Sequence, residues 1–492
     1  MRDDRRVIVI GSGPSGCAAA VALARRGIPV TQLESGRAVP RGLLVRGFGT
    51  NLFRRVPPIP TVPQAMVGDP PAVWYQALVP GGLSNYWTGA VPRFAPDDFV
   101  EGERLDGAYR WPLTYQDLVP FYQEAERLLA ISAGRRDAPG LPAGHVAYPV
   151  RLPSRWERIA RRAESWGQGL VPLPMADGPP WMAWARGTAF NSYSCIVRTL
   201  GRLPHFQLIL GGHAMRLEWD GARRKVDSVV YIDRASGTQQ RLRGAAFVVA
   251  AGPLASARLL MSSTSADFPC GLGNTHGVLG RYLYDHRKSW ARVAVDRPLP
   301  RLHRAAYLTR APYRDSAPLL AAGCTLGTAD HRALAKILAR TPIETTSFGV
   351  VTFSTMIPTA TSSVRLAAEA KDDLGMPLLD VQLESDPSVD RTTSAAHDRL
   401  LEILDASGFR PGLQATETMP AGSSVHYGGT VRMHESPKYG MLNGWNRMHT
   451  VDNVVVADAS SFTTGPDKHP TLTAMAIAAR AAARLADDLR RS

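Results

Sequence analysis

The sequence predicts an α/β fold in which a parallel sheet with covering helices carries an inserted α+β unit. An apolar, β-branched run at Val7–Ile10 enters a glycine-rich turn and then an alanine-rich stretch, the pattern of a buried strand followed by a helix. Residues 287–420 alternate short β-like runs with one helical pattern at about 388–407. The chain then closes on a buried strand, Val454–Val456, and a long helical stretch. At 492 residues the chain is too long for one compact core, so two domains are expected.

The glycine-rich turn has the full context of a dinucleotide fingerprint. Gly11, Gly13 and Gly16 form G-x-G-x-x-G after the first strand, and a second strand, Val30–Leu33, ends at Glu34. Gly11 permits the tight turn, Gly13 lets a pyrophosphate approach the helix N-terminus, and Gly16 allows close packing of helix and strand. Glu34 is expected to accept hydrogen bonds from the ribose. The turn therefore predicts a Rossmann-like dinucleotide-binding domain, with these candidate cofactor-binding residues: Gly11, Gly13, Pro14, Ser15, Gly16 and Glu34.

Two later segments repeat the pattern of a strand that ends in a ligand-binding turn. FVVA, from Phe247, leads into Ala251, Gly252 and a helical stretch, and Asp458 follows the strand at Val454–Val456. Ligands of open α/β sheets bind at the carboxyl ends of the strands. We therefore expect the cofactor to contact these four residues: Ala251, Gly252, Asp458 and Ala459.

The last helix begins at a proline. Pro470 suits a first helical turn, because proline lacks the N–H that would remain unpaired there. His469 and Thr471 then lie at the N-terminus of that helix, facing the same strand ends. All three are candidates for contact with the cofactor.

Composition argues against several classes of function. The net charge is +14, yet only six of the 57 basic residues are lysine and the arginines are scattered, so nucleic-acid binding is not expected. The four cysteines share no C-x-x-C spacing, which argues against a disulfide framework, and no metal is expected. The sequence contains no run of about 18 apolar residues, so no membrane-spanning helix is predicted. No apolar signal segment precedes the fingerprint, which favours a cytoplasmic enzyme.

Several segments, in family order, resemble the glucose–methanol–choline family of flavoprotein oxidoreductases. Besides the fingerprint they are PGGLSNYWTGA (80–90), WPLTYQDL (111–118), LGRYLYDH (279–286), HYGGTVRMH (426–434) and KHPTLTAMAIAAR (468–480). Arg110 stands where the family usually has glycine before the second segment. The resemblance implies a Rossmann-like FAD-binding domain with an inserted α+β substrate-binding domain, a sheet covered by helices. It implies this division: FAD-binding parts at 1–99, 191–286 and 421–492, a substrate-domain or lid segment at 100–190, and the substrate-binding domain at 287–420.

Within the family, the segment NYWTGA and residues 362–388 are most similar to the pyranose oxidase and glycoside oxidase branch. Pyranose oxidases often carry a histidine that bonds covalently to the flavin, and Tyr86 occupies that place here. The resemblance therefore implies FAD bound without a covalent link. It also adds cofactor contacts to those above: Gly82, Ser84, Asn85 and Ala214.

Alcohol oxidation needs a base for the hydroxyl proton, and histidine has a pKa near neutrality. The resemblance assigns this role to His426, with flavin N5 as the hydride acceptor. It also implies that His469 orients the substrate oxygen and shares the proton. His434 and His449 are interpreted as structural, and His286 as structural support near the flavin domain.

The predicted function is oxidation of an alcohol to a carbonyl on a sugar, glycoside or sugar-bearing natural product, aminoglycoside-like molecules included. The reduced flavin is expected to pass its electrons to O2 or to another acceptor. Two alternatives stay open from the sequence: a flavin-containing lyase of the hydroxynitrile-lyase type, and a redox-silent FAD-binding protein. A nicotinamide-dependent monooxygenase is disfavoured, because no strand precedes Gly271-x-Gly273 and the chain has no second fingerprint.

Overall fold

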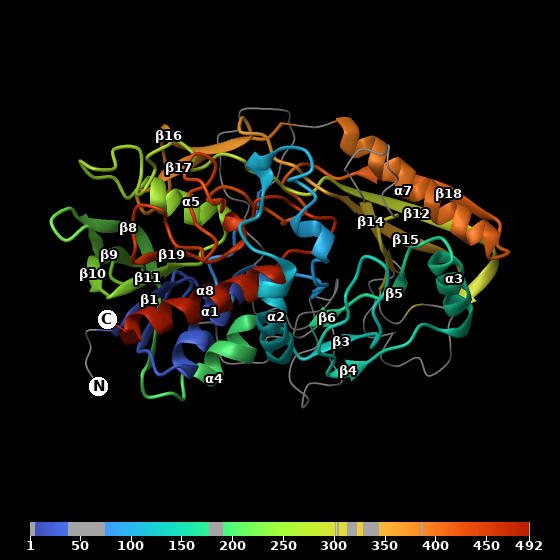
Figure 1. The fold of residues 1–492 in the computed structure, drawn as a ribbon, viewed down its shortest axis with the longest axis horizontal. Coiled ribbons are helices and arrows are strands. Elements are labelled where there is room, and N and C mark those ends of the chain that lie inside the picture. Colours follow the sequence, from blue (N-terminus) through green and yellow to red (C-terminus); the bar gives the residue numbers. More distant parts are fainter. Residues whose placement is uncertain are drawn as a thin grey trace.

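The protein was analysed as a computed structural model that describes residues 5–37, 74–176, 190–300, 302, 305–311, 322–327, 344–384 and 387–491. Two parts lie side by side along the long axis of the molecule (Figure 1). One part contains a parallel sheet with the two chain ends beside it, and the other contains a larger antiparallel sheet. This arrangement confirms the predicted fold class.

The first part is built on a five-stranded sheet in which every neighbouring pair is parallel. In spatial order its strands are β19 (Val454–Val456), β11 (Ala246–Val249), β1 (Val7–Ile10), β2 (Val30–Glu34) and β7 (Phe206–Leu210). All residues of the four strands other than β7 are buried, as a parallel sheet covered on both faces requires. Because the strands are parallel, their carboxyl ends lie at one edge of the sheet.

Helices α1 (Pro14–Arg25) and α8 (Thr471–Arg491) pack against each other beside this sheet (Figure 1). α1 begins at Pro14, before the alanine run at which the sequence predicted it, because proline fits the first helical turn. Thr114 with Asp117 three residues later is the sequence pattern of a helix N-terminus, and helix α2 (Tyr115–Leu129) begins there with a capping box between the two residues. Helix α2 also contacts α8. Helix α5 (Pro253–Met261) follows β11.

One strand differs from its predicted pairing. The consecutive runs FQLIL (206–210), MRLEW and KVDSVVYID, with turns between them, are the sequence pattern of a β-meander. The first of these runs is instead β7, which pairs with β2 at the edge of the parallel sheet. Gly211, at φ +78°, separates β7 from β8. The meander consists instead of β8 (Gly212–Asp220), β9 (Lys225–Asp233) and β10 (Gln239–Arg243).

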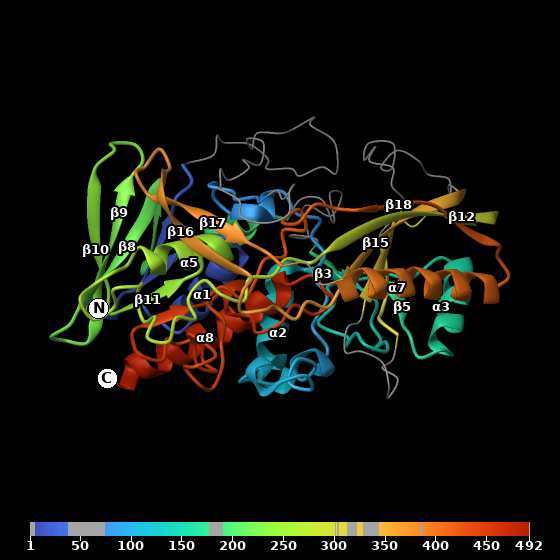
Figure 2. The same ribbon diagram turned by 90° about the horizontal axis from the view of Figure 1, so that it is seen from above.

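The second part is a six-stranded antiparallel sheet that two helices cover. Its strands, in spatial order, are β18 (Pro411–Thr418), β12 (Lys288–Pro300), β15 (Glu344–Ser354), β14 (Ala322–Gly327), β13 (Ala306–Leu308) and β5 (Leu170–Pro172). Helix α7 (Pro387–Ala406) lies along one face of this sheet, with α3 (Ser154–Glu164) near its end (Figure 2). α7 is the helix predicted at about 388–407. Trp156, Phe348 and Leu400 belong to the apolar core between sheet and helices.

The remaining elements are short. The hairpin of β16 (Ser363–Lys371) and β17 (Pro377–Gln382) packs on α5 of the first part. A small sheet joins β3 (Ile131–Ala133), β4 (Tyr148–Pro149) and β6 (Met175–Ala176). Single helical turns are η2 (Gly82–Asn85), η3 (Pro96–Phe99), η4 (Gly107–Tyr109), η6 (Tyr193–Val197), α4 (Arg198–Leu200) and η7 (Ala459–Ser461). Across the described segments, every helix is too short or too polar to cross a bilayer.

Candidate active site

The predicted cofactor residues gather at the carboxyl edge of the parallel sheet. Gly11 follows β1, Glu34 ends β2, Gly252 follows β11 and Asp458 follows β19. These four strand ends come from distant parts of the chain, and the parallel topology brings them to one edge. This is the edge at which open α/β sheets bind their ligands.

The glycines of this edge divide into two kinds. A Cβ atom on Gly11 would lie 2.4 Å from the carbonyl oxygen of Ala250, and one on Gly16 would lie 2.3 Å from that of Gly11. Glycine is therefore required at these two positions because the neighbouring backbone packs too closely for a side chain. A Cβ atom on Gly13 or Gly252 would meet nothing within 4 Å. The open space beside these two backbones fits a dinucleotide that approaches the main chain at the N-terminus of α1.

The Glu34 carboxylate is buried and fully engaged with its neighbours. It accepts hydrogen bonds from the Ser12 amide (3.0 Å), the Ser12 hydroxyl (2.6 Å) and the Gly36 amide (2.6 Å). Burial raises the pKa of this carboxyl above its usual value. The Ser12 hydroxyl also accepts from the Gly81 amide at 2.9 Å, which ties the fingerprint to the loop at 81–85. The contact with ribose remains a prediction.

The loop at 81–85 lies over the fingerprint. A Cβ atom on Gly82 would stand 3.6 Å from the Cα atom of Gly13. The Ser84 hydroxyl donates to the Gly81 carbonyl, and the Asn85 amide donates to the carbonyls of Pro80 and Gly82. Both side chains thus brace their own loop, so the part of it closest to the fingerprint is backbone. Tyr86, which directly follows η2, is half-buried.

Asp458 connects the two later strand ends. Its carboxylate accepts from the Gly252 amide (2.9 Å), the Ser256 hydroxyl (2.6 Å) and the Ser460 amide (2.8 Å). The other predicted cofactor residues lie in the surrounding elements: Pro14, Ser15 and Gly16 in the first turn of α1, Ala214 on β8, Ala251 before α5, Ala459 in η7, and His469, Pro470 and Thr471 at the start of α8. Their contacts with a cofactor remain predictions.

The structure brings three histidines together where the two parts of the protein meet. The rings of His426 and His469 lie 5.0 Å apart between centroids, at an angle of 72°. His286 also contacts His426, with 2.9 Å between the two Nδ1 atoms. Phe353, from β15 of the antiparallel sheet, contacts all three rings. The predicted pair is therefore assembled, and His286 joins it.

The sequence interpretation of His286 as structural support near the flavin domain missed its contact with His426. The signal was present in the Asp-His end of the segment LGRYLYDH, but the partner lies 140 residues further along the chain. The adjacent Asp285 is equally involved, because its carboxylate accepts from the backbone amides of Ser424 (3.2 Å) and His426 (2.8 Å).

The backbone beside His426 is strained. Val425 has φ +61°, a left-handed conformation that is unfavourable for a β-branched residue. Strain of this kind persists where the surrounding structure over-determines the backbone. The two hydrogen bonds to Asp285 flank Val425 and hold it there.

Burial keeps the histidines neutral. It lowers the pKa of His286 to about 4 and that of His469 to about 3, and it holds the pKa of His426 well below its usual value. Burial raises the pKa of the Asp285 carboxyl to about 7 and lowers that of the nearby Lys288 ammonium. A neutral imidazole has a free lone pair, so at neutral pH a ring of this cluster can accept a hydrogen bond from a substrate hydroxyl. Within the described residues, Nδ1 of His469 is buried without a hydrogen-bond partner.

A buried charge cluster precedes His469. The Lys468 ammonium contacts the carboxylates of Asp98 (2.9 Å) and Asp467 (2.7 Å), and all three side chains are fully buried. Arg310 extends the cluster to Asp98 (3.6 Å) and Glu101 (3.0 Å). These pairs connect the segment that carries His469 to η3 and to the chain after β13.

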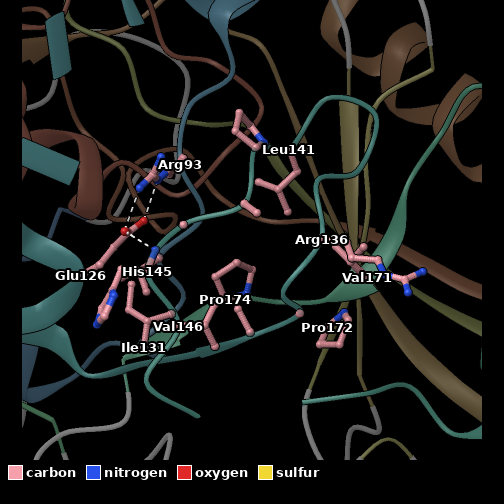
Figure 3. A pocket seen from close by; sticks show the side chains of 16 residues that line it. Arg93, Glu126, Ile131, Arg136, Leu141, His145, Val146, Val171, Pro172 and Pro174 are labelled. Carbon is pink, nitrogen blue, oxygen red and sulfur yellow. Dashed lines mark hydrogen bonds and ion pairs between the residues drawn. The ribbon is translucent and has the colours of Figure 1, made fainter. Parts of the chain in front are cut away.

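The cavity drawn in Figure 3 is a different site. It lies near β3, β5 and the loop at 134–146, with the buried Arg93–Glu126 pair on one wall. Its volume of about 30 Å³ holds about one water molecule. A dinucleotide or a sugar does not fit there, and neither His286, His426 nor His469 lines it.

His434 and His449 have backbone partners away from the three-histidine cluster. His434 Nε2 lies 3.0 Å from the Gly107 carbonyl oxygen, and its Nδ1 accepts from the Ser436 amide at 2.9 Å. His449 Nε2 lies 3.0 Å from the carbonyl oxygen of His434. These contacts agree with the structural interpretation of both residues.

Comparisons with known proteins place the chain in a family. A family model described as GMC oxidoreductase matches residues 358–478. The chain is 31% identical to 6'''-hydroxyparomomycin C oxidase of Streptomyces lividus, over 98% of this chain and 91% of that protein. It is 28% identical to paromamine 6'-oxidase of Streptomyces fradiae, over 99% and 93%. Among solved structures, pyridoxine 4-oxidase from "Mesorbium loti" superposes with a TM-score of 0.68 and 18% identity, covering 99% of each chain.

The chain belongs to the glucose–methanol–choline (GMC) family of oxidoreductases. It is an FAD-dependent enzyme that oxidises alcohol groups, as the motifs predicted. All the relatives named above are oxidases, which gives no support to the lyase alternative.

Proposed function

We propose that this enzyme oxidises a hydroxyl group of a sugar, a glycoside or a sugar-bearing natural product to a carbonyl, with His426 as the base. The observation that carries the proposal is the contact of the His426 ring with the rings of both His469 and His286, at the junction of the nucleotide-binding part and the antiparallel sheet. A substrate bound by the sheet side would meet the base and the cofactor there.

In the proposed mechanism His426 takes the hydroxyl proton and His469 orients the same oxygen. His469 suits this role because it contacts His426 and its buried Nδ1 atom has no hydrogen-bond partner among the described residues. The low pKa of both rings keeps them unprotonated at neutral pH, so each has a free lone pair to offer the substrate hydroxyl. FAD, when bound, supplies the hydride acceptor. The proton would leave a positive charge on the imidazole, which would stabilise negative charge that develops nearby during the reaction.

The strand ends and the loop at 81–85 would hold FAD. The backbones at Gly13 and Gly252 offer the open space for the dinucleotide. We propose that the flavin is bound without a covalent link, because Tyr86 occupies the place of the histidine that pyranose oxidases use for attachment.

The substrate class is proposed from the relatives. The two Streptomyces proteins named above are oxidases of paromamine and of a hydroxyparomomycin, and they align over nearly the whole chain. An aminoglycoside-like or other sugar-bearing alcohol is therefore the first candidate. We propose O2 or another electron acceptor for reoxidation of the flavin. A cytoplasmic location stays a prediction, which fractionation of expressing cells would test.

Anaerobic mixing of the FAD-loaded protein with sugars, glycosides, aminoglycosides and simple alcohols tests the proposal. Loss of the oxidised flavin absorbance with one sugar-bearing class supports it and identifies the class. Bleaching by simple alcohols alone contradicts the sugar assignment. Consumption of a substrate without bleaching contradicts oxidation through the flavin. Subsequent admission of O2 shows whether oxygen restores the absorbance.

A further inference from the structure

We infer that His286 is a positioning residue that sets the tautomer of His426, so that Nδ1 of His426 carries the proton and Nε2 is the basic nitrogen. This inference rests on the proposed role of His426 as the base. It is carried by a chain of contacts from a backbone carbonyl through two imidazole rings.

The first contact determines which nitrogen of His286 carries a proton. His286 Nε2 lies 2.7 Å from the carbonyl oxygen of Pro466 and 3.3 Å from that of Gly465. A carbonyl oxygen only accepts hydrogen bonds, so Nε2 must donate. The proton on Nε2 follows from the backbone rather than from the solvent, because the side chain of His286 is buried.

The second contact determines which ring nitrogen of His426 carries a proton. A neutral imidazole with its proton on Nε2 has an acceptor at Nδ1. Burial keeps His286 neutral, since it lowers the pKa of this ring to about 4. The His426 Nδ1 atom lies 2.9 Å from this acceptor and must therefore donate. Nε2 of His426 is left with its lone pair, which is the atom that can take a proton from an alcohol.

Two neighbouring residues, Asp285 and His286, hold the backbone and the ring of His426. Asp285 accepts the backbone amide of His426 at 2.8 Å, while His286 accepts its ring N–H. The carbonyls that orient His286 belong to the segment just before Lys468 and His469. His286 therefore connects the two segments that carry the proposed catalytic pair. A displacement of either segment would change the contact between His286 and the ring of His426.

Two substitutions distinguish the role of His286 as a hydrogen-bond acceptor from its role in filling space. In His286→Asn the amide oxygen can occupy the place of Nδ1 and accept from His426, whereas His286→Leu fills similar space without an acceptor. The FAD-loaded proteins are labelled with ¹⁵N-histidine, and the ring signals of His426 are identified by their loss in His426→Gln. Flavin reduction by a saturating alcohol and FAD content are measured on the same samples.

We expect the wild type to show a protonated Nδ1 and an unprotonated Nε2 for His426. His286→Leu should give a mixture of tautomers and a flavin reduction rate about 10- to 100-fold lower, the usual effect of losing an orienting partner. His286→Asn should keep the wild-type tautomer and stay within a few-fold of its rate. The FAD content should be equal throughout.

Two results would overturn the inference. One is a proton on Nε2 of His426 in the wild type, a measurement that needs no variant to fold. The other is an unchanged tautomer in His286→Leu. Unchanged flavin reduction in His426→Gln, with Nδ1 protonated in the wild type, would overturn the proposed base and leave the tautomer assignment supported.

Discussion

Replacing Gly13 by alanine should separate protein stability from cofactor binding. Gly13 has φ −64° and ψ 176°, which alanine adopts without strain, and an added Cβ atom meets nothing within 4 Å. A glycine-to-alanine change at such a position stabilises by roughly 0.4–1 kcal/mol through the unfolded chain. Gly13 is also the N-cap of α1, where alanine costs some tenths of a kcal/mol relative to glycine. These effects nearly cancel, so the FAD-free protein should change by less than about 0.5 kcal/mol.

The same methyl group lies where the pyrophosphate is proposed to approach the backbone. Losing one charge-assisted hydrogen bond costs about 1.5–3 kcal/mol, so the Kd for FAD should rise by roughly 10- to 150-fold. Quenching of flavin fluorescence measures the Kd, and thermal denaturation of the FAD-free protein measures stability.

Gly412→Ala is the matched control, because Gly412 lies on β18 of the other sheet and its added Cβ atom also meets nothing within 4 Å. This control should bind FAD normally. An unchanged Kd in Gly13→Ala would refute the assignment of the open space to the cofactor. A large loss of stability in FAD-free Gly13→Ala would refute the conclusion that the space beside the Gly13 backbone is open.

Three further predictions concern the buried groups and the flavin. Lys468→Met should destabilise the protein by about 3–5 kcal/mol in denaturant titrations, because it removes the ammonium that two buried carboxylates share, and adding Asp98→Asn should recover part of the loss. The melting temperature should fall between pH 6.5 and 4: His469 and His286 have folded pKa values below the usual 6.5, so the unfolded chain binds protons first. This fall should be smaller in His469→Asn, and an equal fall would contradict the assignment. Acid precipitation should release all the yellow colour into the supernatant, whereas colour retained in the pellet would indicate a covalent link and refute the expectation drawn from Tyr86.

The elements that the sequence predicted best are those specified by neighbours in the chain. The strand, glycine turn and helix at residues 7–25 form one local unit, and the capping box at Thr114 marks the start of α2. The pairing of β7 was predicted wrongly because its partner β2 lies more than 170 residues earlier. The alternation of FQLIL indicates a strand but contains no information about which sheet it joins.

The same limit applies to the candidate site. The motifs named His426 and His469, but the contact of His286 with His426 spans 140 residues, and the contact of Lys468 with Asp98 spans 370. Such contacts depend on how two parts of the fold meet. The orientation of His286 follows from two backbone carbonyls, and a residue pattern does not specify where a carbonyl points.

The central claim, that His426 accepts the substrate proton, is tested most directly by anaerobic flavin reduction in His426→Ala against His434→Ala. His434 is a buried histidine of the same motif whose ring contacts the Gly107 carbonyl and accepts from the Ser436 amide, so it controls for loss of an imidazole. We predict that His426→Ala retains FAD and reduces it at least about 100-fold more slowly, as loss of a general base does, while His434→Ala stays within a few-fold of the wild-type rate per bound flavin. Flavin reduction at the wild-type rate in His426→Ala would contradict the account.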